Sequence, residues 1–135
     1  MILSTIASGL ASLLGFAQAA ASGHFDEGGF PTGKGWDEAA LPSINDEHAY
    51  ALEISGDQMR PAYRDGDVIV VSPGTPIRRG DRVVVKTRAG EVMAKQLGRL
   101  TAQQIELRSF NPAYQDRSFA LIKIAFVHRI IWASQ

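Results

Sequence analysis

The chain of 135 residues contains no cysteine, which excludes disulfide bridges, thiolate chemistry and cysteine-based metal sites. Its three histidines, His24, His48 and His128, show no ligand spacing, so we expect neither a metal nor another cofactor. The net charge of the chain is zero, because Lys+Arg and Asp+Glu each number 14. A strong nucleic-acid binder normally needs a basic face, so the composition argues against direct DNA binding by this chain.

Residues 1–25 contain no Asp, Glu, Lys or Arg. A signal peptide with a small-x-small site at Ala17-Gln18-Ala19 is one interpretation, but a positively charged start is missing. The stretch also falls short of the roughly 20 strongly apolar residues that a membrane-spanning helix needs. We therefore favour a linker or a first strand that lies on the domain's own apolar surface, in a cytoplasmic protein without a membrane partner.

Short apolar segments separated by turns dominate the rest of the chain. Residues 28–42 are dense in Gly and Pro and predict an extended loop, so we expect an N-terminal segment and linker at 1–45 and one domain at 46–135. The expected strands are HAYALEIS, DVIVV, DRVVVKT, EVMAKQL, QIELRS and the long FALIKIAFVHRIIWAS. Many short strands at roughly ten-residue spacing predict an all-β, barrel-like domain. No stretch after residue 25 keeps a helical apolar period long enough for a helix-turn-helix.

Three motifs follow one another in a more specific pattern: SGDQMRPAYRDGDVIVV from Ser55, GEVMAKQL from Gly90 and SFNPAY from Ser109. Together they resemble the carboxy-terminal domain of LexA and lambda-type phage repressors, the S24 serine peptidases, over roughly residues 50–132. The resemblance implies the LexA/signal-peptidase-like fold, with several coiled β-sheets and a small barrel-like core. It also implies a serine–lysine dyad, since the family pattern is Gly-Asp-Ser-Met-x-Pro, then Asp-Gly-Asp and a lysine in a later strand.

The position that corresponds to the nucleophilic serine holds Gln58. A serine hydroxyl needs a base, and a lysine serves as that base only when burial keeps it neutral. The resemblance assigns Lys95 to the base position, with Lys86 as a rival, and Met59 and Pro61 to the groove wall. A carboxamide has no ionisable hydroxyl, and loss of the nucleophile costs a serine protease on the order of a million-fold in turnover. We therefore expect an inactive peptidase site in which Gln58 hydrogen-bonds to Lys95.

The substrate side of the resemblance departs from the family as well. Family members cut between Ala or Cys and Gly, and the best match in this chain is Ala19-Ala20, where alanine replaces the glycine. Glycine permits a close backbone approach that alanine resists, so this bond is expected to be a poor substrate. The bonds Ser22-Gly23 and Gly28-Gly29 remain alternatives.

In the repressors that the chain resembles, this domain holds two chains together. The resemblance therefore implies a homodimer, formed through the apolar stretch Phe119–Trp132, and a RecA filament as a further partner. Operator DNA would be reached only through a helix-turn-helix outside this chain. Two alternatives stay open: an accessory protein of a mutagenic SOS polymerase, which shares the fold, and an active self-cleaving Ser-Lys peptidase.

Overall fold

The strands follow one another along the chain with almost no helix between them. The structure is a computed structural model that describes residues 10–15, 37–40 and 48–134, with side chains described in 48–134 alone. Its only helical element in these ranges is a turn of 3-10 helix at Leu121–Lys123, so the all-β prediction is confirmed. The strands are β1 (Leu10–Gly15), β2 (Asp37–Ala40), β3 (Tyr50–Glu53), β4 (Val68–Ser72), β5 (Arg82–Thr87), β6 (Val92–Leu100), β7 (Gln104–Arg108), β8 (Arg117–Ala120) and β9 (Ile124–Ala133).

Hydrogen bonds connect the described strands into one sheet with the order β2-β1-β3-β4-β9-β5-β6-β7-β8. Only β1 and β3 run parallel, and the other neighbours are antiparallel. Strand β1, which lies in the apolar N-terminal stretch, pairs with β3 and therefore belongs to the sheet. Within the described ranges, no helix is long and apolar enough to cross a membrane.

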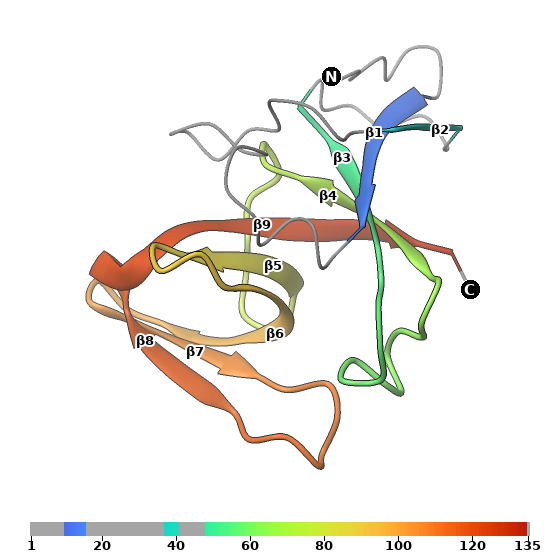
Figure 1. Cartoon of the computed structure of the whole chain (residues 1–135). Helices are drawn as coiled ribbons and strands as arrows, with labels where there is room; N and C mark the ends of the chain where they lie inside the picture. Colours follow the sequence, from blue (N-terminus) through green and yellow to red (C-terminus); the bar gives the residue numbers. More distant parts are fainter. Residues whose placement is uncertain (1–9, 16–36, 41–47, 135) are drawn as a thin grey trace.

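Strand β9 lies between the part of the sheet formed by β1 to β4 and the part formed by β5 to β8 (Figure 1). It pairs with β5 from Ile124 to Arg129 and with β4 from Arg129 to Ala133. The expectation of one uninterrupted strand at the end of the chain was wrong, because the 3-10 turn separates β8 from β9. The turn is fixed from both sides: the amide of Leu121 donates to Gln103, and the carbonyl of Lys123 accepts from the Arg88 amide. This reversal lets β5 to β9 curl into the barrel-like part of the fold.

Strand β5 is buried on both faces, which explains its run of three valines. Val84 belongs to a first apolar cluster with residues of β3, β4 and the loop that follows β3. Val83 and Val85 belong to a second cluster, inside the curl of β5 to β9. A strand covered on both faces has no polar side to present, so its sequence is continuously apolar and does not alternate. The candidate site described next lies where the β3–β4 loop approaches β6.

Candidate functional site

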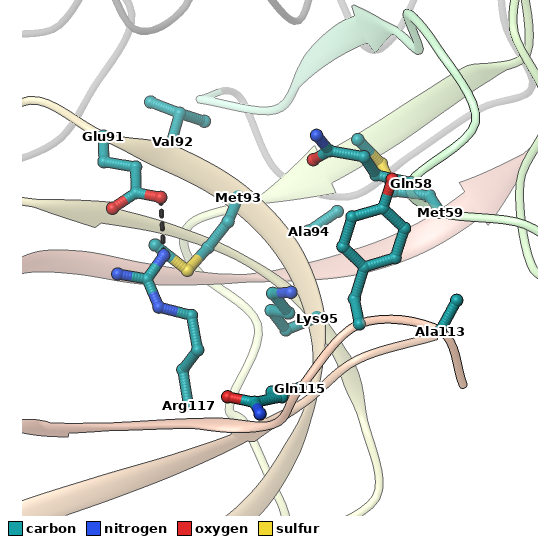
Figure 2. Close-up of a pocket in the computed structure, with 11 residues that line it drawn as sticks. Gln58, Met59, Glu91, Val92, Met93, Ala94, Lys95, Ala113, Gln115 and Arg117 are labelled. Carbon is teal, nitrogen blue, oxygen red and sulfur yellow. Dashed lines mark hydrogen bonds and ion pairs between the residues drawn. The ribbon is translucent and has the colours of Figure 1, made fainter. Parts of the chain in front are cut away.

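A pocket of about 440 Å³ lies between the loop that follows β3, strand β6 and the loop that leads into β8. Gln58 and Met59 line it from the first loop, and Lys95 lines it from β6 (Figure 2). The two positions that the resemblance assigns to a catalytic dyad, 37 residues apart in the chain, therefore share one cavity. Its other lining residues are Glu91, Val92, Met93, Ala94, Ala113, Tyr114, Gln115 and Arg117.

The loop that carries Gln58 is held at its base by the Asp-Gly-Asp motif. The carboxylate of Asp65 accepts a hydrogen bond of 2.8 Å from the amide of Gly56, and the amide of Gly66 donates to the carbonyl of Ile54 at 2.8 Å. Gly66 has a φ of +88°, a conformation that side chains other than glycine rarely adopt. The second aspartate, Asp67, accepts from the Arg64 amide at 2.8 Å and closes the turn. The motif thus has a structural role, which is to fix the two ends of the loop that presents residue 58.

The SFNPAY motif holds the same loop from the opposite side. The side chain of Asn111 donates a hydrogen bond of 3.4 Å to the carbonyl of Asp57, the residue before Gln58. Its own oxygen accepts from the Ala113 amide at 2.9 Å, and its carbonyl accepts from the Tyr114 amide at 3.0 Å. A turn therefore forms at Asn111-Pro112 and places Tyr114 in the pocket wall. The three sequence motifs meet around one cavity.

Lys95 is half-buried, and its environment favours the neutral amine. Burial lowers the pKa of Lys95 from its ordinary value of 10.5, and the positive charge of Arg117 lowers it further. The carboxylates of Glu91 and Asp116 act in the opposite direction and raise it. Because desolvation is the largest of these effects, the net pKa of Lys95 is lowered. That is the direction a lysine general base requires.

One wall of the pocket is an ion pair between the β5–β6 turn and strand β8. Arg117, at the start of β8, donates to the carboxylate of Glu91 at 2.5 Å, as the dashed line in Figure 2 marks. The guanidinium carbon of Arg117 lies 4.7 Å from the centroid of the Phe119 ring. Contact on both sides fixes the guanidinium beside Lys95, where it contributes to the lowered pKa of that amine.

Some residues named from the sequence lie elsewhere. Met59 is buried in the pocket, whereas Pro61 lines a separate hollow with Arg82 and Phe110. Lys86, the rival to Lys95, pairs in β5 opposite Val92 and Phe126 and does not line the pocket. The expected cleavage residues Ala19 and Ala20 fall outside the described part of the chain.

The hydrogen bond expected between Gln58 and Lys95 does not form, although both side chains belong to the described part of the chain. Figure 2 shows the carboxamide end of Gln58 apart from the Lys95 nitrogen in this view. The pocket therefore brings the amide and the amine into one cavity without pairing them.

Sequence reasoning missed the ion pair of Glu91 and Arg117. Glu91 stands four residues before Lys95, which on a strand is the same face, and this spacing was an available signal. Arg117 gives no such signal, because only the fold of the loop before β8 brings it to the pocket. Within the described ranges, no group of three or more His, Asp or Glu side chains could hold a metal ion.

Comparison with known proteins agrees with this geometry. A family model described as Peptidase S24-like matches residues 10–131. The chain is also similar to Repressor protein C of Rhizobium phage 16-3, with 32% identity over 103 residues. That match covers 70% of this chain and 39% of the repressor, so the chain spans about two fifths of the length of its relative. With the family model matching nearly the whole sheet and the pocket at its centre, the chain belongs to the Peptidase S24-like family.

Proposed function

We propose that this chain is the dimerisation and regulatory part of a phage-repressor-like transcriptional regulator, and that its peptidase site lacks the nucleophile. The observation that carries the proposal is the shared pocket of Gln58 and Lys95 in a chain similar to a phage repressor. The site keeps a lysine with a lowered pKa, but the side chain at position 58 offers it no hydroxyl to deprotonate. The similarity to a repressor favours this function over that of a polymerase accessory protein.

The chemical argument for inactivity concerns residue 58 and its neighbours. A carboxamide nitrogen is neither basic nor nucleophilic, so Gln58 cannot form an acyl-enzyme with a peptide carbonyl. Ser55 is the nearest serine in the sequence, but it is exposed and does not line the pocket. Tyr63, the nearest tyrosine in the sequence, is buried in the first apolar cluster and does not line the pocket. The remaining task of the domain is therefore to associate with a second copy of the chain in the cytoplasm. A RecA filament is the candidate inducing partner. Operator DNA would be bound through a helix-turn-helix outside residues 1–135.

Restoration of the nucleophile tests the proposal directly. The purified chain, incubated at alkaline pH and followed by mass spectrometry, should remain a single species for days. The Gln58→Ser variant should release a fragment that begins near Ala20, because Lys95 then has a hydroxyl to deprotonate. The Gln58→Ser/Lys95→Ala variant is the matched control and should stay intact.

Two results would contradict the proposal. Cleavage of the unmodified chain at any bond between residues 15 and 37 would mean that the site is active without a serine at position 58. Cleavage of the Gln58→Ser/Lys95→Ala variant at the same rate as Gln58→Ser would mean that Lys95 is not the base. The Gln58→Ala variant is a control for folding. It should remain uncleaved and keep the circular dichroism spectrum of the original chain, which would show that position 58 tolerates substitution.

A further inference from the structure

The hollow that Pro61 lines is separate from the candidate site. Its volume is about 330 Å³, and its lining residues are Pro61, Ala62, Arg82, Gln96, Ser109 and Phe110. Gln96 follows Lys95 in β6, so the two side chains are directed to opposite faces of that strand. We call this space the arginine hollow, because Arg82 is the one charged residue among the six described residues that line it.

The guanidinium of Arg82 is held in place without a negative partner. Its central carbon lies 5.3 Å from the ring centroid of Tyr63 and 5.6 Å from that of Phe110. The neighbouring carboxylate, Asp81, pairs with Arg129 at 3.6 Å, and within residues 48–134 no ion pair includes Arg82. Contact with aromatic rings orients a cation but does not neutralise it. A guanidinium has five N–H donors, so the hydrogen bond to the Tyr63 side chain leaves others for an anion.

Ser109 adds a second polar group to the arginine hollow. Its Oγ is buried and has no hydrogen-bond partner within the described part of the chain. The backbone of the residue is fixed, because its amide donates to the Asp116 carboxylate at 2.9 Å. A buried hydroxyl without a partner is destabilising, and rotation about χ1 lets a serine exchange one staggered position for another. An acceptor bound in the hollow would therefore supply the partner that this hydroxyl lacks.

The combination of a cation, a hydroxyl donor and apolar walls defines the chemistry of a ligand. We propose that the arginine hollow binds a small organic carboxylate with a flat apolar body, about the size of benzoate. The carboxylate accepts two parallel hydrogen bonds from Arg82, the preferred geometry of this pair, and a third from Ser109. The apolar body lies against Pro61 and Phe110. A volume of 330 Å³ is within the range of small-molecule pockets and exceeds what a single inorganic ion fills.

The arginine hollow also adjoins both segments that hold residue 58. Pro61 belongs to the loop that carries Gln58. Phe110 precedes Asn111, whose side chain donates to the Asp57 carbonyl. A bound carboxylate therefore contacts the two segments together, which is a suitable position for an effector of a regulatory domain. Binding itself requires neither a peptidase activity nor the function proposed above.

Titration of the purified chain with benzoate, at constant pH and ionic strength, tests the proposal. Amide chemical shifts in two-dimensional NMR spectra should change most at Ala62, Gln96 and Ser109. The dissociation constant should be about 1 mM or lower, as expected of a ligand with so few atoms. Benzamide, which has the same shape without the charge, should bind at least about tenfold more weakly. Equal affinity for the two compounds would overturn the proposal, and so would displacement of benzoate by equimolar inorganic phosphate.

Variants then test the two donors. Arg82→Gln should weaken benzoate binding at least about tenfold, whereas Arg82→Lys, which keeps the charge without the paired N–H groups, should give an intermediate affinity. Arg99→Gln is the matched control, because it removes the same charge from an exposed position outside the hollow. Ser109→Ala should weaken binding about tenfold without destabilising the free chain, since the hydroxyl that it removes has no partner there. Unchanged affinity in folded Arg82→Gln or in Ser109→Ala would contradict the assigned contacts.

Discussion

At the scale of single residues, the site is defined by an amine and an amide that share a pocket without a hydrogen bond between them. Burial and the positive charge of Arg117 both lower the pKa of Lys95. Gln58 occupies a loop that is held by hydrogen bonds on both sides, from Asp65 and from Asn111. The loop and the lysine are thus in place while the side chain at position 58 lacks a reactive group.

The lowered pKa of Lys95 predicts a distinct pH profile for its chemical modification. Only a neutral amine attacks an acylating reagent, and a lower pKa gives a larger neutral fraction at any pH below 10.5. Competitive labelling with a small anhydride, quantified by mass spectrometry, should give Lys95 a midpoint below 10.5. A midpoint at or above 10.5 would contradict the described environment.

The Arg117→Gln variant tests the cause of that shift. Removal of the guanidinium removes the positive charge beside Lys95 and leaves Glu91 without its partner, and both changes favour the ammonium form. The labelling midpoint of Lys95 should therefore move upward towards 10.5. The Arg99→Gln variant, which changes an exposed arginine outside the pocket, should leave it unchanged.

The residues of the candidate site were predictable where a motif fixes them. Gln58, Met59 and Lys95 belong to contiguous motifs whose order along the chain indicates one cavity. Pro61 was assigned to the groove wall with them, but the turn after Met59 carries it into another hollow. Arg117 could not be predicted, because its position depends on how a loop packs and not on a local pattern.

At the scale of elements, strand β6 pairs with different neighbours along its length. It pairs with β5 up to Gln96 and with β7 from Gln96 onward, and the second ladder shifts register between Leu97 and Leu100. Gly98 lies inside that shift and is buried against β7. A Cβ at this position would lie 3.1 Å from the Glu106 carbonyl oxygen, a tight contact that glycine avoids.

The Gly98→Ala variant should be destabilised because its Cβ meets backbone that cannot move freely. We expect the free energy of unfolding, measured by urea denaturation, to fall by about 1–3 kcal/mol. Arg99→Ala, at the exposed next position, is the matched control and should change it by less than about 0.5 kcal/mol. A Gly98→Ala variant as stable as the original chain would contradict the described crossing of β6 and β7.

The strands from β3 to β7 were well predicted from composition, because β-branched runs and Gly-Asp turns mark them clearly. The expectation of a loop throughout residues 28–42 was wrong, because β2 lies within that range and pairs with β1. The interruption of the last strand was not, since LIK has the same apolar character as its flanks. Its conformation follows from two long-range backbone hydrogen bonds, from Arg88 to Lys123 and from Leu121 to Gln103. The sequence pattern of the segment itself cannot predict hydrogen-bond partners that lie so far away in the chain.

At the scale of the whole molecule, we place the proposed dimer contact at the end of β9. The β5 ladder stops at Arg129, so in the described pairing the strand beyond that residue has a partner on the β4 side alone. Ile131 and Trp132 are only partly buried and belong to neither apolar cluster in the described part of the chain. These features suit an isologous contact in which each copy presents the same strand.

The Ile131→Glu variant should therefore lose self-association. A two-fold contact would bring the two new carboxylates together in an apolar interface, and like charges in such a place cost several kcal/mol. Sedimentation equilibrium should give a dimer for the original chain and a monomer for the variant. Ile122→Glu, the same substitution at the exposed 3-10 turn, should remain a dimer, and a monomeric original chain would contradict the proposed function.

Because β9 supplies Phe126 and Ile130 to one cluster and Ile124 to the other, neither half of the sheet has a complete interior without it. His128, in the same strand, stacks on Phe126 and is hydrogen-bonded to the hydroxyl of Tyr50 from β3 at 2.8 Å. Deuterium should thus replace the amide hydrogens of Phe126 and His128 only when the entire molecule unfolds. We therefore expect β9 to be the slowest-exchanging segment. Through this strand the two halves of the sheet unfold as one cooperative unit.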